Sequence, residues 1–490
     1  MHPLAKLDHR HVWHPFTQMR DWLKQEPIVL AEGQGAVLRD VRGREYLDAN
    51  SSIWTNLHGH NHPEINAAIR RQLGKLAHSS ALGFANEPAS LLAARLVKAA
   101  NPHTHRGSLK TRSGSELSPP RLSKVFFSDD GSTALEVALK LAYEFTRRTC
   151  PSTPPRFLSL EGAYHGDTVG AVALGHIDLF HRAYSGLLFR TDKVMAPYCY
   201  RCPFNQAKPE RADARDYRVC HWECVRKVAR RFENRRRSGK PYTAFVFEPL
   251  VQGAAGIIPQ PSGWLRQVTE IARANGAQLI ADEVMTGFGR TGVPAVTSQH
   301  AVPDAWWFAC QAEQVQPDFL ALAKGLTGGY LPMAATLTTP AVFEAFLGEY
   351  DELKTFFHGH SFTANQLGAA AALASLDILT SAASLRARLR LQQTLGEALA
   401  GLWTLPKVGD IRQVGLVAGI ELVRNWKRRE PFDLRERAGI RVCEAMARRG
   451  VLTRPVGNVV VLMPPYCTTP AQVRRMVTAL ADSVEDALGK

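Results

Sequence analysis

The sequence predicts an α/β protein in which a large, mostly parallel sheet is accompanied by a smaller α+β unit. The first observation is that short apolar runs alternate with helical patterns. The runs are 124–127, 244–247 and 278–281, and the helical stretches are 133–148, 262–275 and 362–379. Strands that are apolar throughout and separated by helices are typical of a parallel sheet covered on both faces. The second observation is length, since 490 residues exceed one compact core and indicate roughly two or three domains.

The two ends of the chain predict the smaller unit. Residues 36–50 alternate in polarity around the turn Asp40–Gly43 and predict a hairpin. Late in the chain, the pattern is a helix, then strands at 415–420 and 459–462, then a final helix. We expect the hairpin to complete this unit. The expected division is an N-terminal segment 1–65 that joins the small domain, a large domain 66–375 and a C-terminal small α+β domain 376–490.

Charge and composition narrow the class of protein. The chain has 60 Lys+Arg against 45 Asp+Glu, a formal net charge of +15, but the basic residues are scattered and accompany no nucleic-acid-binding motif. No apolar run approaches the ~18 residues of a membrane span, and the N-terminus lacks the apolar core of a signal peptide. Eight cysteines are too few for a disulfide scaffold. We therefore expect a cytoplasmic protein with no nucleic-acid and no membrane partner.

The segment that follows the first apolar run suits a phosphate. A strand end, a glycine turn and a capping box between Thr133 and Glu136 predict the start of a helix. Gly131 and Ser132 then present backbone N–H groups and a hydroxyl at the positive end of that helix, where an anion binds well. Taken alone, such a segment is more often a plain helix start.

Three further strand ends carry polar side chains. Asp282 and Glu283 end an apolar run, where a carboxylate is costly unless it faces a cation or a hydrogen-bond donor. Lys324 ends another, where desolvation lowers the pKa of an amine and makes it a nucleophile, unless the side chain simply extends to solvent. Tyr164 and His165 lie between glycines after a strand and suit stacking on a flat ring, or else form a loop with a buried tyrosine.

The four features together point to one ligand. A phosphate site, a carboxylate, a lysine and an aromatic ring fit a flat, phosphorylated molecule that carries a carbonyl, and pyridoxal 5′-phosphate has these properties. Lys324 would form the Schiff base, Asp282 would keep the pyridine nitrogen protonated, and Tyr164 would pack on the ring. Gly131 and Ser132 would bind the phosphate.

Three stretches carry a resemblance to a known family: DEVMTGFGRTG at 282–292, ALAKG at 321–325 and HGHSFTANQLGAAAALASL at 358–376. They resemble the class III aminotransferases, which are fold-type I pyridoxal-phosphate enzymes, and the likeness covers nearly the whole chain. It implies that Lys324 bonds the cofactor and moves the substrate proton, and that Asp282 pairs with the pyridinium. It also implies a homodimer with shared active sites, in which Ser361 reaches the phosphate in the partner subunit.

Within the family, other stretches are similar to the members that convert 8-amino-7-oxononanoate to 7,8-diaminononanoate in biotin biosynthesis. For this small-molecule substrate the resemblance implies that Arg454 binds the carboxylate and that Trp54 lines the aliphatic part. Arg290 and Gly359 are implied as further substrate contacts. The implied amino donor is S-adenosylmethionine or L-lysine. The stretches are 11–19, 50–60 and 453–465.

Two alternatives stay open. One is another class III ω-aminotransferase, which would act on a diamine or an ω-amino acid with the same cofactor chemistry. The other is a basic or zinc-bearing binding protein on a decayed enzyme scaffold, although the lysine, aspartate and phosphate-site residues are all present. Family members often have tryptophan where this chain has Ile53, and many have tyrosine in place of Phe16, which changes the shape of the substrate pocket.

Two segments fall outside this scheme. Four cysteines have a spacing that resembles a zinc ribbon, with His221 as a possible further ligand. The alternative, which we favour, is that these cysteines are reduced thiols that bind no metal. The stretch 293–317, which carries Trp306, Trp307 and Cys310, is expected to be a surface elaboration or else a lid, and 103–123 an exposed insertion. The four cysteines are Cys199, Cys202, Cys220 and Cys224.

Overall fold

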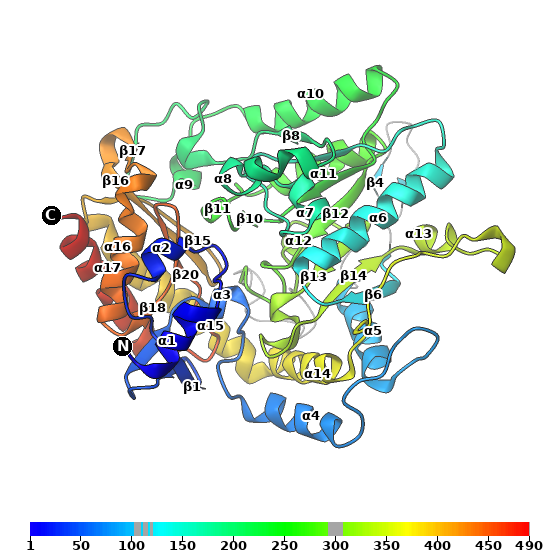
Figure 1. Cartoon of the computed structure of the whole chain (residues 1–490). Coiled ribbons are helices and arrows are strands. Elements are labelled where there is room, and N and C mark those ends of the chain that lie inside the picture. Colours follow the sequence, from blue (N-terminus) through cyan, green and yellow to red (C-terminus); the bar gives the residue numbers. More distant parts are fainter. Residues whose placement is uncertain (102–108, 111–115, 118–120, 293–306, 490) are drawn as a thin grey trace.

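The computed structural model describes residues 1–101, 109–110, 116–117, 121–292 and 307–489. A large sheet with helices on both faces forms one part of the molecule (Figure 1). A second sheet packs beside it, and both chain ends lie on the side of that second sheet.

Seven strands form the large sheet, and six of them point the same way. The exception is β14, which is antiparallel to both of its neighbours, β13 and β6. This confirms the mostly parallel sheet that the apolar runs predict. In sheet order the strands are β6 (Lys124–Ser128), β14 (Ala334–Thr338), β13 (Phe319–Leu322), β12 (Gln278–Asp282), β9 (Ala244–Phe247), β7 (Phe157–Leu160) and β8 (Asp192–Val194).

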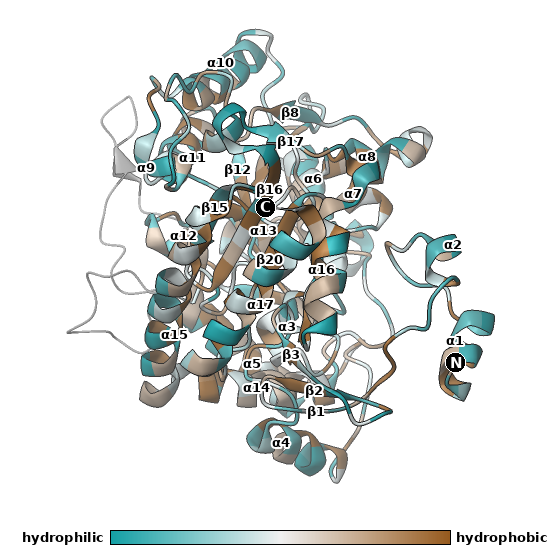
Figure 2. Ribbon diagram, turned by 90° about the vertical axis from the view of Figure 1, so that its left-hand side faces the viewer, coloured by the Kyte–Doolittle hydropathy of each residue, from teal (hydrophilic) through white to brown (hydrophobic). Residues whose placement is uncertain are grey.

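Alternate residues of these strands face opposite helical layers. In β9, Ala244 and Val246 share a core with α6, whereas Phe245 and Phe247 share a core with α10 and α11. Because successive side chains of a strand point to opposite faces, strands that are apolar at every position need helices on both sides. Figure 2 shows the outer helix α10 with many hydrophilic residues. The helices of the two layers are α5 (Glu87–Ala100), α6 (Gly131–Thr149), α10 (Glu223–Arg237), α11 (Trp264–Ala274) and α14 (Gln366–Thr380).

The C-terminal part forms a smaller antiparallel sheet. The strand expected at 415–420 is displaced, because Gly415 lies in the turn before it with φ 60°. A Cβ at Gly415 would approach the backbone of Gly292 to 2.1 Å, so the turn requires glycine. The strands, in sheet order, are β15 (Val408–Val414), β16 (Val417–Asn425), β20 (Val459–Leu462) and β19 (Pro455–Val456), with β17 (Glu430–Pro431) beside β16. The helices are α15 (Ala382–Ala400), α16 (Ala438–Arg448) and α17 (Pro470–Leu488).

The N-terminal segment forms a third sheet, and the predicted hairpin is confirmed within it. Strands β2 and β3 pair in antiparallel fashion, and β1 adds to β2. The fourth strand comes from the other end of the chain, since β18 runs parallel to β3 and pairs Val451 with Leu47. The strands are β1 (Leu30–Gln34), β2 (Val37–Asp40), β3 (Glu45–Asp48) and β18 (Val451–Leu452), and the nearby helices are α1 (Pro3–His11), α2 (Met19–Trp22), α3 (Ser51–Trp54) and α4 (Pro63–Leu73).

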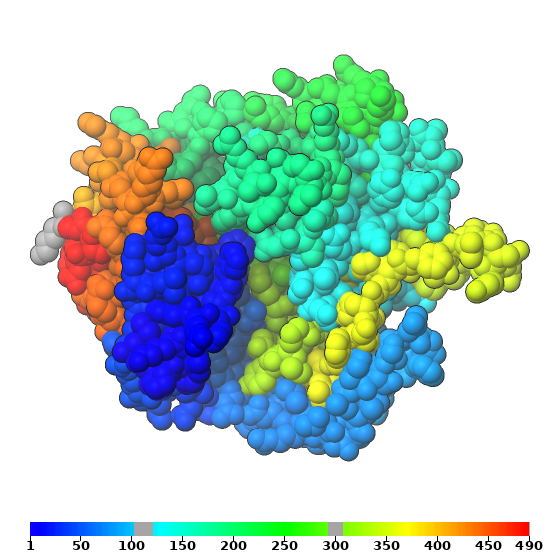
Figure 3. All heavy atoms as spheres, in the orientation of Figure 1, coloured from blue at the N-terminus to red at the C-terminus, as the bar shows by residue number. Residues whose placement is uncertain are grey.

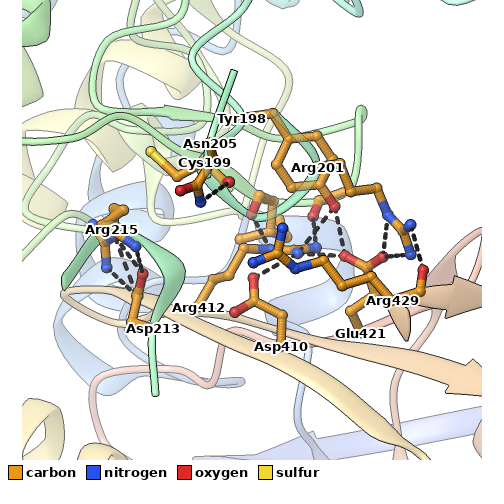
Figure 4. A network of polar contacts seen from close by, with 12 residues as sticks. Tyr198, Cys199, Arg201, Asn205, Asp213, Arg215, Asp410, Arg412, Glu421 and Arg429 are labelled. Atoms are coloured by element: carbon orange, nitrogen blue, oxygen red, sulfur yellow. Dashed lines mark hydrogen bonds and ion pairs between the residues drawn. The ribbon is translucent and has the colours of Figure 1, made fainter. Parts of the chain in front are cut away.

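A buried network of charges connects the C-terminal sheet to the large part of the molecule (Figure 4). At its centre is Arg412 on β15, whose side chain is 2% exposed. Arg201 donates a hydrogen bond of 2.7 Å to the carboxylate of Glu421, and burial raises the pKa of Asp410 to about 6. The guanidinium of Arg412 donates to Asp410 at 3.0 Å, to Glu421, to the Tyr198 hydroxyl at 3.0 Å, and to the carbonyl oxygens of Gly256 at 2.7 Å and Ile257 at 2.9 Å.

Most of the described part of the stretch 293–317 is buried, so the expectation of a surface elaboration is wrong there. Trp307 and Cys310 belong to the large core. The helix α12 (Ala309–Ala312) begins against Glu283, whose carboxylate accepts the backbone N–H of Ala309 at 2.9 Å and of Cys310 at 2.8 Å. A carboxylate at this position satisfies N–H groups that a helix start leaves free. Residues 293–306, with Trp306, and most of 103–123 lie outside the described residues.

In the described ranges, no single helix is long and apolar enough to cross a membrane. The stretches Gln366–Thr380 and Ala382–Thr404 meet that criterion only as a pair, which is bent by 71°.

Candidate active site

Polar side chains gather in one cavity at the carboxyl ends of the parallel strands. The cavity has a volume of about 730 Å³ and lies where β6, β7, β9, β12 and β13 end. Open α/β sheets bind ligands at this edge, and the volume is within the range of small-molecule sites. The residues singled out from the sequence that line it are Trp54, Gly131, Ser132, Tyr164, His165, Asp282 and Lys324.

The start of α6 faces this cavity. The N-cap is Asp130, whose carboxylate accepts the N–H of Thr133 at 2.9 Å, while the Thr133 hydroxyl accepts the N–H of Asp130 at 3.0 Å. The capping box expected between Thr133 and Glu136 is therefore wrong, since the helix begins earlier. A Cβ on Gly131 would lie 2.6 Å from the side chain of Val284, so only glycine lets this turn approach the cavity wall. The free N–H groups of a long helix start suit an anion.

Ser132 and Thr168 form a hydrogen-bonded pair beside this helix start. Ser132 Oγ lies 2.8 Å from Thr168 Oγ1 and accepts the N–H of Thr168 at 2.9 Å. Glu136 accepts the Thr168 hydroxyl at 2.5 Å and the N–H of Gly170 at 2.7 Å. Its carboxylate thus fixes the start of α7 (Val169–Leu174) against α6. The sequence analysis missed Thr168, because no local pattern distinguishes it from other loop threonines.

Asp282 and His165 form a buried pair in the wall of the cavity. Asp282 Oδ2 lies 2.7 Å from His165 Nδ1, and Asp282 Oδ1 accepts the N–H of Val284 at 3.1 Å. These contacts hold the carboxylate in one orientation, from which it can pair with a cationic ring nitrogen. The structure places His165 as the partner of Asp282, and its stacking on a ring stays a prediction.

Tyr164 lines the cavity next to His165. Its hydroxyl donates to Asp167 at 2.7 Å, and its ring lies parallel to that of His181, with 6.3 Å between the ring centroids. Burial is the main cause that raises the pKa of Tyr164, so the phenol keeps its proton and acts as a donor.

Lys324 follows β13 and reaches into the cavity. Its backbone is in the left-handed region at φ 43°, and its Nζ lies 4.9 Å from the centroid of the Trp54 ring. Burial lowers the pKa of the Lys324 amine, against the opposing effects of the Asp282 and Glu248 carboxylates. A lysine with a lowered pKa has more of the neutral amine, which is the nucleophilic form.

Trp54 is held in the cavity wall by a strained turn. The four residues Ser51–Trp54 all lie in the left-handed region, with φ values of 47°, 49°, 65° and 69°. Side chains other than glycine adopt this region at a cost of roughly 1–2 kcal/mol each. Ser51 Oγ donates to the carbonyl of Met463 at 2.6 Å, and Trp54 Nε1 donates to Asn50 Oδ1 at 2.8 Å. Strain of this kind persists where surrounding contacts hold it, and it is often found at functional sites.

Four other residues singled out from the sequence do not line this cavity. Arg290 is buried behind it and donates to the carbonyl oxygens of Asn56 at 2.9 Å and Pro464 at 3.0 Å. Gly359 and Ser361 lie in an exposed loop, and Arg454 is exposed and has no ion pair within the described ranges. The role of each as a substrate or cofactor contact stays a prediction.

Glu248 is a cavity residue that the sequence analysis missed. It follows β9 as Asp282 ends β12, so the strand-end pattern that identified Asp282 would also have found it. Its carboxylate accepts the N–H of Gly253 at 2.8 Å and that of Tyr164 at 3.4 Å. Burial raises the pKa of Glu248 to about 7.

The four clustered cysteines border one small cavity away from the site. Burial raises the pKa of Cys199 to about 12 and that of Cys224 to about 11, so both thiols are protonated and poorly reactive. As described, the chain has no group of three or more His, Cys, Asp or Glu side chains placed to hold a metal ion. Cys202 and Cys220 complete the set around this cavity.

Comparisons with known proteins agree with this arrangement. The model of the family "Aminotransferase class-III" matches residues 19–484. The chain is 45% identical to an adenosylmethionine-8-amino-7-oxononanoate aminotransferase of Geobacter sulfurreducens, over 99% of this chain and 98% of that one. It is 44% identical to the protein of the same name from Nitratidesulfovibrio vulgaris, over 98% and 81% of the two chains.

Solved structures show the same fold. The crystal structure of the adenosylmethionine-8-amino-7-oxononanoate aminotransferase from Methanocaldococcus jannaschii superposes with a TM-score of 0.85 at 36% identity, over 99% of both chains. A PLP-bound amine transaminase from an uncultivated Pseudomonas species has a TM-score of 0.83 at 29% identity, over 97% of this chain and 99% of that one. The family model covers most of the chain, and each of these relatives matches 97% or more of it. The chain therefore belongs to the class III aminotransferase family.

Proposed function

We propose that the protein is a pyridoxal 5′-phosphate-dependent aminotransferase that transfers an amino group to 8-amino-7-oxononanoate in biotin biosynthesis. The observation that carries this proposal is the placement of Lys324, Asp282 and the start of α6 around one cavity. The relatives named for this activity match 98–99% of this chain, which supports the same substrate here.

The residues present fit the cofactor. The start of α6 at Gly131 lines the cavity, and the first N–H groups of a helix have no partners within it, so they suit a phosphate, with Ser132 beside them. Asp282, oriented by His165, faces the same cavity as a partner for a protonated ring nitrogen. Pyridoxal 5′-phosphate would supply an electrophilic carbonyl and a ring that accepts electrons.

Lys324 has two tasks in this proposal. Its amine, whose pKa burial lowers, would hold the cofactor through the cofactor's carbonyl carbon. Nζ would also take and return the proton at the substrate carbon that exchanges the amino group, because Lys324 lines the cavity in which that carbon would lie. Tyr164 lines the cavity and would pack against the cofactor ring.

The acceptor would lie along Trp54, with Arg454 as the partner of its carboxylate and with Arg290 and Gly359 as further contacts. Trp54 lines the cavity, which supports its part of this assignment. The amino donor is S-adenosylmethionine or L-lysine. The domain division 1–65, 66–375 and 376–490, and a cytoplasmic location, belong to the same proposal.

The site would be completed by a second copy of the chain, with Ser361 reaching the phosphate of the partner subunit. The loop that carries Ser361 is held beside the cavity rim, since His360 Nδ1 lies 3.4 Å from Asp129 Oδ2 and the carbonyl of Ser361 accepts from His78 at 2.8 Å. The segment after α13 (Pro340–Glu344) projects from the body (Figure 3), and Tyr350 in it is 94% exposed. Exposed apolar and aromatic side chains of this kind support a homodimer.

The two half-reactions test the proposal separately. The protein is loaded with pyridoxal 5′-phosphate, and its visible absorbance is followed as S-adenosylmethionine or L-lysine is added alone. Loss of the band with one donor, and its return on addition of 8-amino-7-oxononanoate, is the expected result. A band that a donor removes and this keto acid does not restore would refute the substrate and favour another ω-aminotransferase. No band in the loaded protein would refute the cofactor.

A further inference from the structure

Glu248 occupies a central position among the groups of the site. Its strand β9 lies between β12 and β7 in the large sheet, so Glu248 emerges between Asp282 and the loop of Tyr164 and His165. The carboxylate accepts one N–H from each of two cavity walls, that of Tyr164 and that of Gly253. One side chain thus ties both walls to the end of β9.

The carboxyl of Glu248 is buried among charged groups without a cation of its own. Asp282 faces it from β12, His165 from the loop after β7, and Lys324 from the end of β13. Within the described ranges no ion pair reaches Glu248. Burial and the neighbouring Asp282 raise its pKa to about 7, against the effect of His165, so this acid gains and loses its proton near neutral pH.

The charge of Glu248 acts on Lys324. Among the groups that affect the lysine amine, the carboxylates of Asp282 and Glu248 raise its pKa, whereas burial and the buried Arg290 lower it. A neutral Glu248 therefore favours the neutral amine of Lys324, and an ionised Glu248 favours the ammonium form.

We propose that Glu248 is a positioning residue of the amine site, whose carboxyl holds the wall of Tyr164 and His165 in place and sets how readily Lys324 gives up its proton. This role rests on the proposed function, in which the Lys324 amine must be neutral to bond the cofactor and must carry a proton in the next step. The charge of Asp282 alone would act on the Lys324 amine in the same way at every pH near neutral. Glu248 gains and loses its charge in this range, so its effect on the protonation of Lys324 changes with pH.

The test is the reactivity of Lys324 in the full chain without added cofactor. Cyanate reacts with neutral amines, and mass spectrometry of the peptide that contains Lys324 gives the extent of modification at each pH. Glu248→Gln keeps the shape of the side chain and one acceptor oxygen but removes the charge. We expect it to lower the pH of half-maximal reactivity by up to about 1 unit. The same midpoint in Glu248→Gln and in the wild type would overturn the proposal.

Two further variants separate charge from structure. Glu161→Gln alters an exposed carboxyl on the same loop as Tyr164, outside the cavity, and should leave the midpoint of Lys324 unchanged. Glu248→Asp keeps the charge but shortens the side chain, so it should stay closer to the wild type than Glu248→Gln does. If both Glu248 variants shift the midpoint equally, the role is structural only and the proposal fails.

A second measurement does not depend on the Gln variant being folded. Infrared spectra of the wild type should contain carbonyl bands of buried protonated carboxyls below about pH 7, and should lose them above that pH. Burial also raises the pKa of Glu283 to about 7, so the band of Glu248 is the one that changes frequency in Glu248→Asp and not in Glu161→Asp. If no such band changes in Glu248→Asp, the proposal is overturned. Neither measurement uses an amino donor or turnover, so each result is independent of whether the protein transaminates 8-amino-7-oxononanoate.

Discussion

Replacing Arg412 with methionine would remove the cation at the centre of the buried network between the C-terminal sheet and the large part of the molecule (Figure 4). Methionine fills much of the same space, so the change mainly removes charge and hydrogen-bond donors. Glu421 would still be paired with Arg201, but Asp410 would lose its ion pair. Two carbonyl oxygens, of Gly256 and Ile257, would lose their donors as well.

The expected loss follows from these contacts. Removing one partner of a buried ion pair costs about 3–5 kcal/mol of unfolding free energy, because the other charge stays buried. Each of the two buried carbonyls without its donor adds about 1–3 kcal/mol, so we expect a total loss of at least about 5 kcal/mol. Without the cation the pKa of Asp410 rises further above 6. The loss should therefore shrink as the pH falls and the carboxyl becomes neutral.

Urea unfolding at several pH values measures this loss, with the unfolding free energy taken from the midpoint and slope. The matched control is Arg424→Met on the neighbouring strand β16. Arg424 also pairs with a carboxylate, Glu436 at 2.6 Å, but its side chain is 50% exposed. A pair so exposed contributes no more than about 1 kcal/mol. Equal losses in the two variants, or a loss at Arg412 that does not decrease at acid pH, would refute the reasoning.

Three other substitutions give direct tests. Lys324→Arg keeps the positive charge but replaces an amine that can lose its proton with a group that cannot, so the donor half-reaction should be abolished, and any donor-dependent loss of visible absorbance would contradict this. Ile53 is a β-branched residue at φ 65°, and Ile53→Gly removes a backbone strain of roughly 1–2 kcal/mol. Glycine costs about 0.5–1 kcal/mol in flexibility of the unfolded chain, which is the smaller effect, so the urea midpoint should rise slightly, not fall. Burial raises the pKa of Glu283 to about 7, above its unfolded value, so this group stabilises the fold at low pH and loses that contribution as the pH rises through 7. Glu283→Gln should flatten the dependence of unfolding free energy on pH by about 3 kcal/mol at most, and an unchanged slope would count against the assignment.

Local patterns were enough to predict most of the sheet and half of the site. Asp282 and Lys324 could be found because each directly follows a run that is apolar at every position, and the structure places both in the cavity. The position of Arg290 could not be predicted. The local sequence of an arginine beside a glycine turn is the same whether its side chain binds a ligand or, as here, the carbonyl oxygens of Asn56 and Pro464. Contacts between segments that are distant in sequence determine whether such an arginine lines the cavity or is buried behind it.

The same limit applies to pairs and to strain. His165 meets Asp282 across 117 residues of sequence, so its partner is visible only in the folded chain. The left-handed turn Ser51–Trp54 contains no glycine that would predict it. Ser51 is held by a carbonyl 412 residues later, and such distant contacts override the backbone preference.

The pairing of β3 with β18 has a consequence for the order in which the molecule can be made. The strand that completes the sheet of the hairpin, Val451–Leu452, is synthesised long after β3 itself. Until then the outer edge of β3 offers unpaired backbone groups to any other strand in reach. A nascent chain must therefore keep this edge unoccupied until β18 has been made. Release of the chain before β18 would leave this sheet open.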